Sequence, residues 1–88
     1  MNPEVVTTAA RGAKHATRAL ATIVSLYQKQ LSTQDVEVLA RELREILIST
    51  RQALHAIENA APETATASNL RDAQQSAGDA ARSLAHVH

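Results

Sequence analysis

Residues 36–57, VEVLARELREILISTRQALHAI, decide the fold of this chain. Large apolar residues recur in this stretch at steps of mostly three and four, which places them along one stripe of an α-helix. These residues are Val36, Leu39, Leu43, Ile46, Leu47, Leu54 and Ile57. Thr50 interrupts the stripe, and in a helix its hydroxyl is expected to bond the carbonyl of Ile46. Such a stripe must be buried, so other helices are expected to cover it.

The composition predicts a thin hydrophobic core. The chain has 88 residues, of which 18 are alanine, and Tyr27 is its sole aromatic residue. A buried Leu or Ile contributes ~1.5–3 kcal/mol, whereas alanine adds little beyond one methyl group. Either the alanines let the helices approach closely, or a second copy of the chain completes the core.

Several classes of protein are disfavoured by composition. The chain has no cysteine, which excludes disulfides and thiolate metal sites. No apolar run approaches the ~20 residues of a membrane span, and no signal-peptide core is visible, so a cytoplasmic location is expected. Abundant alanine and arginine with little lysine are typical of a high-GC bacterial or phage coding sequence.

Three helices are expected, at about residues 3–31, 34–60 and 66–85. Asn2, Pro3 and Glu4 form a strong helix start. Ser32 or Thr33 is suited to cap the second helix, and Pro62 is expected to stop it. The start of the third helix stays open between residues 62 and 69, because Pro62 could begin it or a later polar residue could cap it.

The predicted fold class is all-α: an antiparallel up-down-up bundle of three helices in a single helical domain, residues 1–88. Short turns make neighbouring helices antiparallel. In this register the stripe of the first helix meets that of the second, with Val24 opposite Leu43 and Leu20 opposite Leu47. The alternative architecture is a helical hairpin of the first two segments that dimerises into a four-helix bundle with a peripheral third helix.

No residue pattern indicates catalysis, a cofactor or a metal site, so a non-enzymatic role is expected. The serines lie in helical or capping contexts without a nucleophile elbow. No two histidines have the i, i+4 spacing of a helical zinc site. The histidines are His15, His55, His86 and His88.

Val38 and Ile48 fall off the main apolar stripe, on the side shared with Glu42 and Glu45. Two off-stripe apolar residues in a core-poor protein indicate a partner surface, so these four residues form the predicted interface. The predicted function is a small helical interaction or oligomerisation module acting through helix faces. Its expected partner is a second copy, as a dimer, or another helical protein.

Arg11, Lys14, His15 and Arg18 form a basic strip along the first helix. The alternative function is therefore binding of nucleic acid or a membrane surface through this strip. The formal net charge of zero and the lack of stacking aromatic residues make nucleic acid an unlikely partner. A solvated helix face is the ordinary explanation.

The strip gives a first testable prediction. Replacing Arg11, Lys14 and Arg18 together by alanine should leave the thermal melting curve almost unchanged, because exposed charges contribute little to stability. The wild type should bind DNA and anionic vesicles weakly or not at all at physiological salt. Tight, salt-sensitive binding that the triple substitution abolishes would instead support the alternative function.

Overall fold

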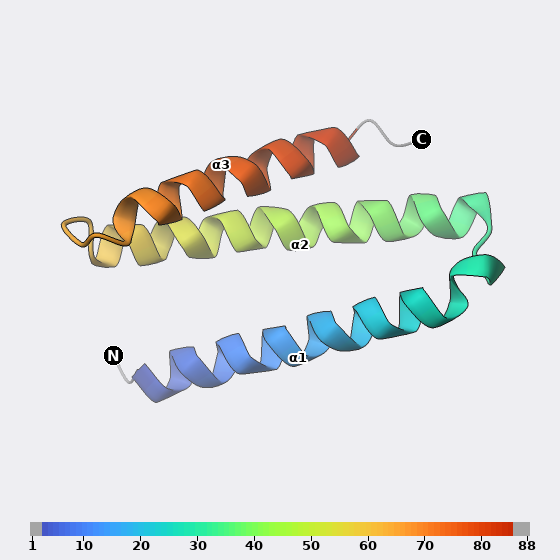
Figure 1. Ribbon diagram of the computed structural model, residues 1–88, viewed down its shortest axis with the longest axis horizontal. Coiled ribbons are helices and arrows are strands. Elements are labelled where there is room, and N and C mark those ends of the chain that lie inside the picture. Colours follow the sequence, from blue (N-terminus) through green and yellow to red (C-terminus); the bar gives the residue numbers. More distant parts are fainter. Residues whose placement is uncertain (1–2, 86–88) are drawn as a thin grey trace. The chain divides into compact units, whose positions relative to one another are not determined.

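The computed structural model describes residues 3–85, and these residues form three α-helices and no β-strand (Figure 1). Helix α1 spans Pro3–Tyr27, α2 spans Thr33–Ala60 and α3 spans Ala67–Leu84, with a short 3-10 helix, η1, at Gln28–Gln30. The all-α class is therefore confirmed. The third helix begins at Ala67, inside the interval that the sequence left open.

The chain divides into two compact units, Met1–Leu31 and Ser32–His88. The first unit consists of α1 and η1, and its α-helix is four residues shorter than the expected 3–31 because the backbone tightens into the 3-10 turn after Tyr27. The second unit is the α2–α3 hairpin. The predicted register between the first and second helices stays a prediction.

Helix α2 begins with a reciprocal cap, which explains its sharp start. The Ser32 hydroxyl accepts a hydrogen bond from the Asp35 backbone N–H at 3.1 Å, and the Asp35 carboxylate accepts one from the Ser32 backbone N–H at 3.0 Å. Each side chain satisfies a backbone donor that the first helical turn would leave unpaired. The bond from the Ser32 backbone, followed by the bond involving its side chain, lowers the pKa of Asp35.

Residues 61–66 join α2 to α3 through local hydrogen bonds. The Ala61 N–H donates to the Glu58 carbonyl at 3.1 Å, and Pro62 follows directly, so α2 ends where proline was expected to stop it. Thr66 occupies the N-cap position of α3, but its side chain makes no capping hydrogen bond. The first residue of α3, Ala67, is instead anchored by burial, with 2% of its surface exposed.

Helices α2 and α3 lie side by side and antiparallel (Figure 1). The buried residues of this hairpin are all small: Ala40, Ala67, Gly78 and Ala81. The remaining apolar side of α3, which includes Leu70, Ala77 and Leu84, is half-buried, as the sequence pattern predicted. Close approach of small residues therefore holds this helix pair, and no large side chain within residues 4–85 is fully buried.

The face of α2 that meets α3 is centred beside its apolar stripe, of which Leu47 and Leu54 are also half-buried. Contacts with α3 come from Arg51, His55 and Glu58, which recur at steps of four and three and continue the row of Arg44 and Ile48. This row follows the apolar stripe by one residue, which is a rotation of about 100° around the helix. These polar residues lie outside the apolar stripe that the sequence predicted to be buried, and the structure shows that they contact α3.

The cap of α2 gives the second prediction. Ser32→Ala removes the acceptor for the Asp35 N–H and should lower the free energy of unfolding by about 1 kcal/mol in a urea melt. Gln34→Ala is the matched control, because Gln34 is an exposed residue of the same turn and is expected to leave the melt unchanged. Equal effects of the two substitutions would show that the cap contributes nothing specific.

Candidate functional site

The apolar stripe of α2 is the first candidate site, because much of it stays in contact with solvent. Val36, Leu43, Ile46 and Ile57 are exposed to between 39% and 52%, whereas the other apolar members of the stripe, Leu39, Leu47 and Leu54, are half-buried. Within the stripe, the Thr50 hydroxyl donates to the Ile46 carbonyl at 2.8 Å, as expected from the sequence. The stripe therefore presents apolar side chains with no unpaired hydroxyl among them.

The four residues of the predicted interface have different surroundings in the structure. Val38 is 42% exposed, whereas Ile48 is half-buried and lines a groove between α2 and α3. Glu42 is exposed, and the Glu45 carboxylate lies 3.7 Å from an Arg44 guanidinium nitrogen. Of the two apolar members, only Val38 lies on an open surface.

The basic strip of the first helix lies within the first unit. Its four residues, Arg11, Lys14, His15 and Arg18, all lie exposed on α1. No group of three or more His, Asp or Glu side chains suited to a metal ion occurs within residues 3–85, and His86 and His88 lie outside the described residues. None of the helices described is long and apolar enough to cross a membrane.

A polar network joins the two helices near their connecting loop. The carboxylate of Glu58 accepts hydrogen bonds from the Arg71 guanidinium and, at 2.9 Å, from the Gln74 side-chain amide. The amide oxygen of Gln74 lies 3.3 Å from Nδ1 of His55. The Glu58 side chain is only 15% exposed, so these partners replace much of its contact with water.

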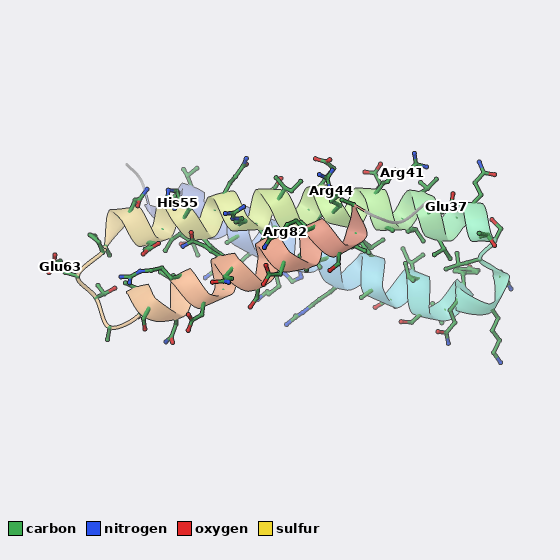
Figure 2. All side chains as sticks on the ribbon, turned by 90° about the horizontal axis from the view of Figure 1, so that it is seen from above. Glu37, Arg41, Arg44, His55, Glu63 and Arg82 are labelled. Atoms are coloured by element: carbon green, nitrogen blue, oxygen red, sulfur yellow. The ribbon has the colours of Figure 1, made fainter. Side chains whose placement is uncertain are left out.

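The second candidate site is the groove next to this network. It has a volume of about 480 Å³ and is lined from both helices. Its lining residues are Arg44, Ile48, Arg51, Gln52, His55, Gln74, Gly78, Ala81 and Arg82. In Figure 2, Arg82 on α3 lies beside the part of α2 that carries Arg44 and His55.

Sequence reasoning missed this groove, because its residues are dispersed along the chain. Basic residues at helical spacing within one helix are visible in a sequence, and the strip on α1 is such a case. Arg44 and Arg51 are seven residues apart and could have been recognised as sharing a face of α2. Arg82 comes close to these two arginines only because α3 packs against α2. Gly78, which lets the α3 backbone approach Arg51, is the local feature of the sequence that points to this packing.

Comparisons with models of protein families, with curated proteins and with solved structures found no match to this chain.

The Glu58 network gives the third prediction. The hydrogen bond from Gln74, followed by that from Arg71, lowers the pKa of Glu58 in the folded state, although burial acts in the opposite direction. This stabilisation is complete above the ordinary carboxyl pKa and is lost as the pH falls through the lowered value. Glu58→Gln should therefore reduce the loss of stability between pH 7 and pH 3 in urea melts.

Glu63→Gln is the control for this prediction. Glu63 is exposed in the loop between α2 and α3 (Figure 2), so its substitution should leave the difference in stability between the two pH values unchanged. If Glu58→Gln behaved like Glu63→Gln, the network would have no net effect on stability.

Proposed function

We propose that this protein is a non-enzymatic helical module that self-associates, with the apolar stripe of α2 packing against a second copy of the chain. The main support for this proposal is that Leu43 and Ile46 on the stripe stay about 40% exposed, although α3 packs on the neighbouring face of α2. An exposed row of large apolar residues on a charged helix is typical of an interface between proteins.

The thin core supports association as the means of stabilising the protein. The buried residues of the α2–α3 hairpin are alanines and a glycine, which contribute little apolar area. Small domains with such cores commonly depend on oligomerisation. A second copy of the chain would supply the large apolar partners that the hairpin lacks, in place of the register within one chain that the sequence predicted between the first two helices.

Charge also supports a second copy as the partner. Residues 1–31 carry four basic residues and one acidic residue, a formal charge of +3. Residues 32–88 carry five basic and eight acidic residues, a formal charge of −3. Opposite charges on two segments of one sequence favour association between copies, since the basic segment of one copy complements the acidic segment of the other.

The fourth prediction tests this interface with a matched pair of substitutions. Ile46 and Val38 lie on the same helix and are 41% and 42% exposed, but only Ile46 belongs to the stripe. In a two-fold dimer Ile46→Glu would remove two buried apolar contacts, worth ~1.5–3 kcal/mol each, and should weaken association by about 100-fold or more. Val38→Glu should leave association unchanged.

Light scattering over a concentration series measures the association, and thermal melts supply an independent readout. The melting temperature of the wild type should rise with protein concentration, because association stabilises the folded form. A monomer mass at high micromolar concentration with a concentration-independent melt would contradict the proposal. Loss of the dimer in Val38→Glu but not in Ile46→Glu would instead support the interface around Val38, Glu42 and Glu45.

A further inference from the structure

The groove between α2 and α3 gathers positive charge from two helices. Arg44 and Arg51 reach it from α2, and Arg82 reaches it from α3. A second hollow beside it is also lined by Arg51 and Arg82, and Arg71 is added there. No aspartate or glutamate lines either hollow in the described part of the chain, so their charged lining is entirely basic at neutral pH.

Gly78 makes room for one of these side chains. A Cβ atom placed on Gly78 would lie 3.5 Å from Cδ, Nε and Cζ of Arg51, so the Arg51 side chain passes directly over the glycine. The arginine stem therefore lies against the backbone of α3. This contact lies at the edge of the groove, which Arg51 and Gly78 both line.

The arginines differ in how far acidic residues satisfy them. Arg82 pairs with Asp79 one turn earlier on α3, and both side chains are mostly exposed. The Glu45 carboxylate is 3.7 Å from a terminal nitrogen of Arg44, but Nε of Arg44 is buried and has no hydrogen-bond partner within the described residues.

Arg51 has no ion pair or hydrogen bond within residues 3–85. The nearby Glu58 is already bound by Arg71 and Gln74. Arg51 is exposed, so its guanidinium group is open to a ligand, whereas the buried Nε of Arg44 is a donor whose missing partner is costly. An oxyanion is the group that two guanidinium groups bind best.

We propose that this groove binds a small organic anion that carries a carboxylate or phosphate group. The oxyanion would lie between Arg44 and Arg51, and the apolar part of the ligand would contact Ile48 and Ala81, which also line the groove. The volume of about 480 Å³ is suited to a small molecule. The site lies on the α3 side of α2, so it is independent of the proposed interface on the apolar stripe.

The probes are phenyl phosphate and benzoate, titrated into isotope-labelled protein at constant ionic strength while the arginine Nε–H signals are followed by NMR. The Nε–H signals of Arg44 and Arg51 should shift most, and that of Arg41 should not shift. Tighter binding of phenyl phosphate would indicate a phosphate ligand, and tighter binding of benzoate would indicate a carboxylate ligand. Benzyl alcohol, which lacks the anionic group, should leave the signals in place.

Arg51→Gln and Arg44→Gln should each weaken binding of the preferred probe by about tenfold or more, because each removes a charge-assisted hydrogen bond. Arg41→Gln is the matched control: it removes the same charge from an exposed position of α2 outside the groove (Figure 2) and should change the affinity less than about twofold.

Three results would overturn the proposal: no shift of the Arg44 and Arg51 signals with either anion, binding of benzyl alcohol as tight as that of the anions, or equal weakening by Arg41→Gln. The wild-type titration decides the matter even if a groove variant fails to fold.

Discussion

The structure depends on a geometric constraint in α2, which carries two stripes of residues one position apart. The apolar stripe and the row from Arg44 to Glu58 are rotated by about 100° from each other, so one neighbouring helix cannot cover both completely. Helix α3 covers the polar row. Both candidate sites follow from this arrangement, since part of the apolar stripe is left exposed and the polar row lines a groove beside α3.

Helix α3 suits the polar row because its contact side is small. Alanine and glycine let the two backbones approach, and the long stems of arginine then fill the remaining space with apolar methylene groups while their charged ends reach the surface. Arg51 over Gly78 shows this arrangement directly. At the loop end, Glu58 and Gln74 replace apolar packing with hydrogen bonds. The hairpin is therefore held by small contacts and polar bonds rather than by large buried side chains.

Much of the fold follows from local signals in the sequence. Ser32 and Asp35 supply the start of α2, Pro62 marks its end, and the alanine side of α3 is buried or half-buried as its spacing predicts. The face of α2 that contacts α3 could not be predicted. Apolar periodicity identifies the face of a helix that is favourably buried, but it does not identify the helix that packs against each face. Arginine adds to this ambiguity, since its stem is apolar while its formal charge assigns it to solvent.

Because the sequence does not show which helix covers which face, it also did not predict the groove between α2 and α3. A binding site made from one helix appears as a spacing, as in Arg11, Lys14, His15 and Arg18, whereas a site made by packing appears only when two helices meet. In this hairpin the arginines that fill the contact between α2 and α3 are also the ones that line the groove. Packing and charge therefore cannot be separated at Arg51. Its stem helps to hold α3 in place, and that contact in turn keeps an unpaired cation beside Arg44, where an anion would satisfy both.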